Sequence, residues 1–164
     1  MIYNLYRCLN NYFQKLLPEY LKEAGYSTHL VGKWHLGRSQ NGSLPLERGF
    51  DSFYGILGAE LHPFIHGSGR PMLYDGDNLV DQSGDYATYL FSDRAEQILR
   101  ESSDKPKFIY LSYTAPHAPH AAPIDLKETV RKELVARNPG VKECGTELTN
   151  HSDTDKNRGK PSPT

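Results

Sequence analysis

The chain has 164 residues, of which 37% are hydrophobic and 24% are charged, and its formal net charge is -1. This length fits one compact domain, and the balanced charge gives no electrostatic reason to expect nucleic acid or an anionic membrane as a partner. No run approaches the roughly 18 apolar residues of a membrane span. The first residues, MIYNLYRCLNNYFQKLL, lack the unbroken apolar core of a signal peptide, so we expect no signal in the chain as written.

The two cysteines, Cys8 and Cys144, lie near opposite ends of the chain. Two widely separated cysteines do not make a disulfide framework, and neither is part of a Cys-x-x-Cys pair. We therefore interpret both as free thiols without a redox or zinc role.

The first predicted elements are a helix over residues 16–25 and a strand over residues 26–32. Pro18 suits the first turn of the helix, and Gly25 suits the position just after its end. The strand, YSTHLVG, contains the β-branched residues Thr28 and Val31. The spacing predicts one apolar helix face, formed by Leu17, Tyr20, Leu21 and Ala24.

Residues 33–84 are rich in Gly, Pro, Ser and Asp, and we expect long loops with little regular structure there. An aromatic stretch, RGFDSFYG, interrupts them at residues 48–55. The stretch YDGDN at residues 74–78 predicts a turn, because Asp-Gly tolerates the positive φ that turns require.

The second half of the chain predicts a helix, a strand and another helix. The helix GDYATYLFSDRAEQILRES can be capped by Asp85. The strand covers residues 108–113 and ends in a proline-rich loop, IDLKETVRKELVA follows as a helix, and from about Asn138 the polar composition predicts disorder. The expected apolar stripe of the first helix comprises Leu90, Phe91, Ala95, Ile98 and Leu99.

This alternation of helices and strands favours an α/β fold with a parallel sheet. Ligands of such sheets bind beyond the carboxyl ends of the strands. Lys33, His35 and His117 all lie just past a predicted strand end. Adjacent parallel strands would therefore bring these three side chains to one crevice.

One lysine and two histidines suit an anionic, oxygen-rich group such as a sulfate or phosphate ester. Lys33 supplies a fixed positive charge, and a histidine can protonate the leaving oxygen. Flanking glycines, Gly32 and Gly37, let the backbone approach a ligand closely. The alternative is that these are ordinary solvated loop residues, and Trp34 between them is more typical of packing than of a stacking platform.

Two histidine pairs, His62 with His66 and His117 with His120, have spacings that resemble metal-binding pairs. No third ligand is evident for either pair. A metal-binding or phosphoester-handling α/β protein is therefore the alternative that the residues alone leave open.

The stretch AGYSTHLVGKWHLG resembles the second signature of the sulfatases, a family of the alkaline phosphatase-like superfamily. LPEYLKEAGY, LPLERGFDSFYG and FIYLSYTAPHAPHAAP resemble the same family, most of all its arylsulfatase-type members. The resemblance implies an incomplete alkaline phosphatase-like domain, with a mainly parallel sheet flanked by helices. It also implies an atypical extension over residues 1–15, a partial catalytic domain over 16–135 and a polar tail over 136–164.

The resemblance also implies site roles. Lys33 matches the lysine that contacts the sulfate and the nucleophile, His35 matches the histidine that hydrogen-bonds the nucleophile, and His117 matches the histidine that contacts the ester oxygen. The family's nucleophile is a formylglycine made from Cys or Ser in a C/S-x-P-x-R motif, and a calcium ion held by Asp and Asn polarises the sulfate. The family implies a lysosomal or extracellular compartment.

The sequence departs from this pattern in what it lacks. No C-x-P-x-R or S-x-P-x-R motif occurs, because Cys8 lies in CLNNY and Cys144 in CGTEL, and the calcium ligands have no counterpart either. We therefore expect an internal fragment of a sulfuric ester hydrolase that is inactive alone and marginally stable. The alternative is a catalytically dead sulfatase-like chain that binds a sulfated ligand or a partner, and the substrate stays open between a small aryl sulfate and a sulfated sugar.

Overall fold

The computed structural model describes residues 14–38, 42–58, 62–66 and 72–138. The chain divides into two compact units, residues 1–120 and residues 121–164. The second unit contains one described helix, α4 (Ile124–Arg137), which confirms the helix expected there. The predicted polar tail lies almost entirely outside the described residues. No helix in the described part of the chain is long and apolar enough to cross a membrane.

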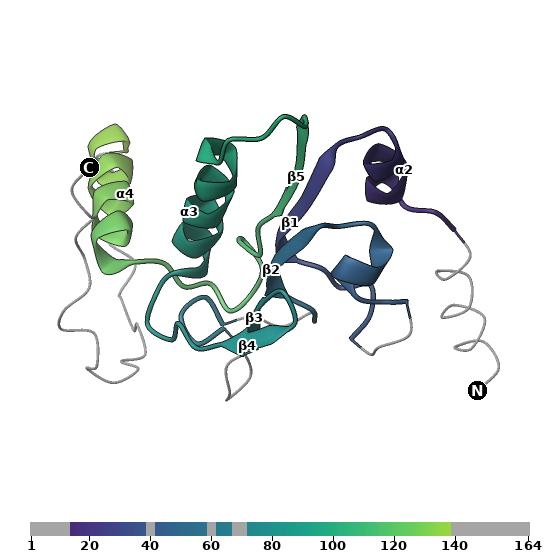
Figure 1. Ribbon diagram of the computed structural model, residues 1–164. Helices are drawn as coiled ribbons and strands as arrows, with labels where there is room; N and C mark the ends of the chain where they lie inside the picture. The colour runs from purple at the N-terminus through teal and green to yellow at the C-terminus, as the bar shows by residue number, and fades with distance from the viewer. Residues whose placement is uncertain (1–13, 39–41, 59–61, 67–71, 139–164) are drawn as a thin grey trace. The chain divides into compact units, whose positions relative to one another are not determined.

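The first unit is built on a five-stranded mixed sheet with the strand order β4-β3-β2-β1-β5 (Figure 1). β1 (Ser27–Lys33) lies parallel to both of its neighbours, β2 (Ser52–Ile56) and β5 (Lys107–Ser112). β3 (Leu73–Asp75) and β4 (Asn78–Val80) form an antiparallel hairpin that joins the sheet beside β2. The predicted α/β class with a mainly parallel sheet is thereby confirmed.

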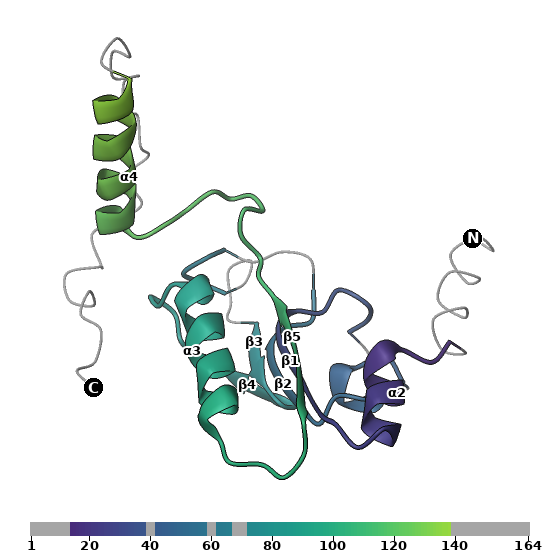
Figure 2. The same ribbon diagram turned by 90° about the horizontal axis from the view of Figure 1, so that it is seen from above.

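Helices cover the two faces of this sheet, as Figure 2 shows from above. α3 (Ala87–Arg100) lies on one face, and α2 (Leu17–Glu23) and the short 3-10 helix η1 (Pro45–Arg48) lie toward the other. Successive residues of a strand point to opposite faces, so Val31 joins the α3 core and Leu30 joins the second core. The α3 core comprises Val31, Tyr54, Ile56, Leu73, Ala87, Phe91 and Ile98, and the second comprises Leu30, Trp34, Phe50, Phe53 and Leu57.

The end of α2 follows the prediction made from Gly25. Gly25 has a φ of 89°, and its N–H donates to the Lys22 carbonyl while the next N–H, of Tyr26, donates to the Leu21 carbonyl. This Schellman arrangement satisfies carbonyls that the helix leaves unpaired. The predicted apolar face is wrong in the described chain, because Leu17 is 60% exposed and Tyr20 is 55% exposed. The hydrophobic spacing is present, but of the four residues only Leu21 is partly buried.

The stripe predicted for α3 is mostly confirmed. Phe91, Ala95 and Ile98 are buried, but Leu99 is 65% exposed, so its assignment to the stripe was wrong. The predicted cap was also wrong, because Tyr86 occupies the N-cap position and makes no side-chain cap hydrogen bond. Asp85 instead offers its main-chain carbonyl to the ring of His66.

The expectation of long loops over residues 33–84 was only partly correct, because this region also contains η1, β2, β3 and β4. The aromatic stretch contains β2, whose residues from Phe53 onward are buried without the alternation that marks a half-exposed strand. The predicted turn at residues 74–78 is confirmed, and it connects β3 to β4 through Gly76, which has a φ of 60°. Strand pairing with β1 stabilises β2, and single-strand patterning does not reveal such pairing.

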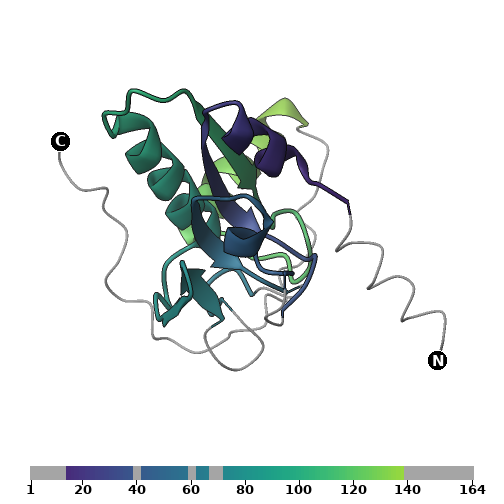
Figure 3. The same ribbon diagram turned by 45° about the vertical axis from the view of Figure 1, so that its right-hand side comes forward.

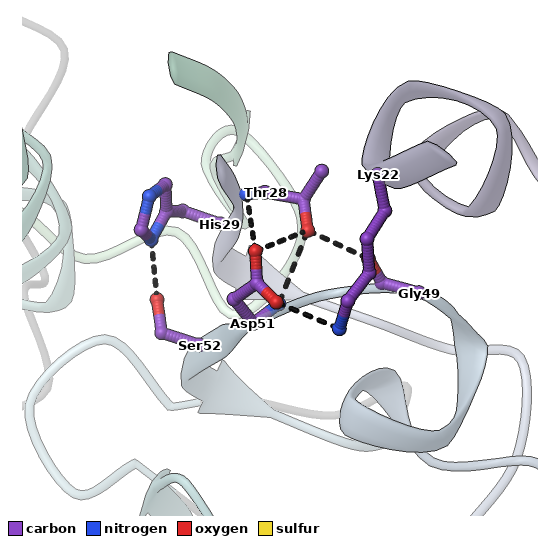
Figure 4. A network of polar contacts seen from close by, with 6 residues as sticks. All are labelled: Lys22, Thr28, His29, Gly49, Asp51 and Ser52. Atoms are coloured by element: carbon purple, nitrogen blue, oxygen red, sulfur yellow. Dashed lines mark hydrogen bonds and ion pairs between the residues drawn. The ribbon is translucent and has the colours of Figure 1, made fainter. Parts of the chain in front are cut away.

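A polar network at the amino end of β1 joins three segments (Figure 4). The buried Thr28 donates its main-chain N–H to the Asp51 carboxylate over 3.0 Å and its hydroxyl to the Gly49 carbonyl over 2.6 Å. The Lys22 ammonium pairs with the same carboxylate at 2.7 Å. Burial opposes ionisation of Asp51, but the contacts with Lys22 and Thr28 outweigh it and lower its pKa. The network therefore holds α2 and the segment before β2 against β1.

Candidate functional site

The loop that follows β1 continues along the end of β2. Lys33, the last residue of β1, is half-buried and lies opposite Ile56 in the parallel ladder. The N–H of Trp34 donates to the Ile56 carbonyl over 2.9 Å, and the N–H of His35 donates to the Leu57 carbonyl over 3.2 Å. His35 is exposed and has a φ of 62°. Main-chain hydrogen bonds therefore hold both predicted site residues of this loop at the carboxyl edge of the sheet.

Gly32 sets the distance between β1 and β5 immediately before Lys33. It has a φ of 114°, and a Cβ on it would lie 1.9 Å from the main-chain oxygen of Ser112. Gly37 is similarly close to Ser43, because a Cβ added to Gly37 would lie 2.5 Å from the Cβ of Ser43. Both glycines thus allow the chain to approach itself, which is a different role from the close approach to a ligand that the sequence suggested.

Trp34 packs into the core between the two site residues. Its ring is 7% exposed, meets Phe50 edge-on at 6.0 Å between centroids, and donates from Nε1 to the Ser43 carbonyl over 2.8 Å. The prediction that this tryptophan serves packing is confirmed. A buried aromatic ring between Lys33 and His35 anchors the loop from which both side chains project.

Glu47 organises the segment that receives the Trp34 ring. One oxygen of its carboxylate accepts the N–H groups of Gly42, Ser43 and Leu44 over 2.9 to 3.0 Å. Glu47 was not among the predicted site residues, although it lies in the stretch LPLERGF. The detectable signal was Glu at the third position after Leu44, where a glutamate can reach back to the main-chain N–H before a helix.

We expect Glu47→Ala to loosen this segment and to expose Trp34 to water. Three amides would lose a charged acceptor, and such hydrogen bonds contribute roughly 1.5–3 kcal/mol each when well shielded and less at an exposed site. Trp34 is the only tryptophan, so its fluorescence emission should shift to longer wavelength. Glu133→Ala on α4 removes the same charge elsewhere and should leave the emission unchanged; equal spectra for both variants would contradict the anchoring role.

The third predicted residue, His117, lies in the proline-rich loop after β5 and is exposed. Its main-chain N–H donates to the Thr114 carbonyl over 2.9 Å, and its Nδ1 donates to the Ala118 carbonyl over 2.6 Å. Since this contact requires the proton on Nδ1, the neutral ring has an unprotonated Nε2. Nε2 is then the ring nitrogen that takes no part in this contact.

The fold places the two loops that carry these residues at the same edge of the sheet. β1 and β5 are parallel neighbours with Gly32 opposite Ser112, so their carboxyl ends lie side by side. Figure 3 shows the segments after both strands leaving the same end of the sheet. Lys33 and His35 belong to the first loop and His117 to the second. Their joint action on one ligand stays a prediction.

A family model described as Sulfatase matches residues 6–142. The chain belongs to the sulfatase family. It is 41% identical over 116 residues to arylsulfatase J of Mus musculus, and the aligned region covers 65% of this chain and 19% of the relative. It is 30% identical over 119 residues to the human N-acetylgalactosamine-6-sulfatase, which covers 65% of this chain and 23% of the relative. This sulfatase chain thus spans about a fifth to a quarter of the length of these curated relatives.

Solved structures of sulfatase-like fold agree with this assignment. The crystal structure of Ps i-CgsB in complex with k-i-k-neocarrahexaose matches with a TM-score of 0.61 and 28% identity, over 79% of this chain and 31% of that chain. The structure of BT4656 in complex with its substrate D-glucosamine-2-N,6-O-disulfate matches with a TM-score of 0.50 and 27% identity, over 66% of this chain and 20% of that chain.

The residues described in this sulfatase chain do not form a metal centre. No group of three His, Cys, Asp or Glu side chains converges within residues 14–38, 42–58, 62–66 and 72–138. His62 uses Nδ1 to accept the N–H of Phe64 at 3.3 Å, and His66 directs Nε2 to the Asp85 carbonyl at 2.8 Å. We therefore assign no metal ligand to either histidine pair.

His66 is fully buried, and its Nδ1 has no hydrogen-bond partner among the described residues. Burial lowers the pKa of this ring below its ordinary value of 6.5, although the Asp85 carbonyl and the carboxylates of Asp85 and Asp81 act in the opposite direction. His62 adds to the lowering. A protonated ring would place a charge on the unpartnered Nδ1 in the interior.

We therefore expect the free energy of unfolding of this sulfatase chain to fall as the pH decreases from about 7.5 to about 5. The folded pKa lies below the unfolded one, so the unfolded state binds more protons in this window and acid favours it. His29, whose pKa burial also lowers, contributes in the same direction. Urea titrations across the window measure the slope, which His66→Gln should reduce and His120→Gln should leave unchanged. A free energy that stays constant or rises toward acid would contradict this account.

Proposed function

We propose that this chain supplies the oxyanion-binding and leaving-group side of an active site that hydrolyses sulfate esters. The observation that carries the proposal is the loop after β1, where main-chain hydrogen bonds and the buried Trp34 hold Lys33 and His35 beside the end of β5. Membership of the sulfatase family supports a sulfate ester as the ligand of this arrangement. D-Glucosamine-2-N,6-O-disulfate, the substrate named for BT4656, supports a sulfated sugar as the ligand class.

Each residue has a proposed role in the reaction. The Lys33 ammonium neutralises charge on the sulfate oxygens, which increases as the ester bond breaks. His117, protonated at Nε2, donates that proton to the departing alcohol oxygen as the S–O bond breaks, which prevents the release of an unstable alkoxide. His35 hydrogen-bonds the group that attacks sulfur and orients it.

The attacking group and the metal ion are proposed to come from outside these 164 residues. The family's formylglycine nucleophile requires a C/S-x-P-x-R motif that the sequence does not contain. A calcium ion would add positive charge at the sulfate, but the described residues offer no ligand set for it. By the same family relationship, we propose a lysosomal or extracellular compartment.

A catalytically dead, sulfate-binding chain is the second candidate. The absence of the nucleophile motif from this sequence favours it for the isolated chain. Hydrolysis of 4-nitrophenyl sulfate by the purified chain would exclude it.

The direct test is binding of N-acetylglucosamine 6-sulfate to the ¹⁵N-labelled chain, followed by NMR. We expect the amide signals of Lys33 to His35 to shift. Lys33→Met should weaken binding about tenfold or more, because a charge-assisted contact is lost. Lys105→Met, which removes the same charge before β5, should bind normally. Saturable shifts elsewhere, or unchanged affinity of Lys33→Met, would refute the proposal.

A further inference from the structure

Arg38, on the loop that carries Lys33 and His35, lies against the main chain of Gly58. A Cβ on Gly58 would lie 1.7 Å from Nη2 and 2.3 Å from Cζ of Arg38. Gly58 is buried, whereas Arg38 is exposed. The guanidinium therefore lies against the main chain of Gly58.

Arg38 has no counter-charge in the described residues. No hydrogen bond or ion pair joins it to any residue within them, whereas four other arginines of the described chain each pair with a carboxylate. These pairs are Arg48 with Glu19, Arg94 with Asp75, Arg100 with Glu96, and Arg137 with Glu133. An arginine that is positioned but unpaired retains its donors for a ligand.

The guanidinium lies at the same sheet edge as the proposed sulfate site. His35 donates to the carbonyl of Leu57, the residue immediately before Gly58. Ile56, two residues before Gly58, is the ladder partner of Lys33. Gly58, and the guanidinium against it, therefore lie within two residues of the main-chain groups that hold Lys33 and His35.

We propose that Arg38 binds a second anionic group of the substrate, a sulfate or a carboxylate on the sugar that carries the scissile sulfate or on its neighbour. Its planar guanidinium can donate two parallel hydrogen bonds to such a group. This inference rests on the proposed function and narrows it: the substrate class is a polyanionic saccharide, and a simple aryl monosulfate lacks the group that Arg38 recognises.

The test compares three ligands of the ¹⁵N-labelled chain by NMR titration. N-Acetylglucosamine 6-sulfate carries one anion, glucosamine 2-N,6-O-disulfate carries two sulfates, and a uronic acid joined to N-acetylglucosamine 6-sulfate carries a sulfate and a carboxylate. We expect at least one dianionic ligand to bind more tightly than the monosulfate. Arg38→Gln should lower the affinity for that dianionic ligand about tenfold and the affinity for the monosulfate less than about twofold.

Matched variants separate recognition by Arg38 from a general effect of charge. Arg100→Gln makes the same charge change on an exposed residue in the last turn of α3 and should leave the ratio of affinities unchanged. Arg38→Lys should retain part of the preference for the dianionic ligand over the monosulfate. The Arg38 proposal alone is overturned if the monosulfate binds and neither dianionic ligand binds more tightly. It is also overturned if Arg38→Gln lowers the affinity for all three ligands equally. If no ligand binds, the proposed function is overturned as well.

Discussion

Gly32→Ala should strongly destabilise the first unit. The added Cβ would lie 1.9 Å from the Ser112 oxygen, and the opposing atoms belong to the main chain of β5, which cannot rotate away as a side chain could. The φ of 114° is itself unfavourable for alanine. We expect a loss of roughly 3–5 kcal/mol, comparable to the whole stability of a small domain.

Urea titration followed by Trp34 fluorescence and circular dichroism measures this loss. Gly84→Ala is the control, because Gly84 has a similar φ of 100° but nothing within 4 Å of an added Cβ. It should cost about 1 kcal/mol, the conformational part alone. Equal losses for the two variants would show that backbone conformation, and not the contact between β1 and β5, makes glycine necessary at position 32.

The close contact at Gly32 also matters for the site. Lys33 follows Gly32 directly, and Ser112 lies five residues before His117. If the strands separate at this point, the loop with Lys33 and the loop with His117 separate as well. A Gly32→Ala chain that still folds at low temperature should therefore also bind a sulfated sugar more weakly.

Phe91→Ala should produce the largest loss among core truncations. The ring is fully buried at the centre of the α3 core and meets Tyr54 edge-on at 6.3 Å between centroids. Removing a buried phenylalanine ring costs about 3–5 kcal/mol, because the lost apolar burial is added to the cost of the cavity. α3 would then detach from the sheet, which urea titration reports as an earlier midpoint.

Leu99→Ala on the same helix is the matched control. The hydrophobic period assigns Leu99 to the same stripe as Phe91, but its side chain is 65% exposed. We expect a change within about 0.5 kcal/mol, as for other surface substitutions. A loss of several kcal/mol for Leu99→Ala would mean that α3 is covered on this side as well.

Features that depend on local chemistry could be predicted from the amino-acid sequence. Hydrophobic period, Pro18 and Gly25 locate α2, and the apolar runs locate β1 and β5 within one residue. Lys33, His35 and His117, which follow strand ends, predicted a site at the carboxyl edge of the sheet. The stretch GKWHLG and its flanking stretches pointed to the sulfatase family, to which the chain belongs. These signals are local, because turn residues and strand propensity act over a few neighbouring positions.

Which residues are buried and what the glycines contact depend on long-range packing, which the sequence pattern does not reveal. β2 is a strand because it pairs with β1, Leu99 is exposed because α3 meets the sheet on a narrower face, and Gly32 faces Ser112 from a strand about eighty positions away. The position of Arg38 on Gly58 and the anchoring of Trp34 by the Glu47 segment have the same origin. Contacts between distant segments depend on how strands pair and helices dock, and no short stretch of sequence records that arrangement.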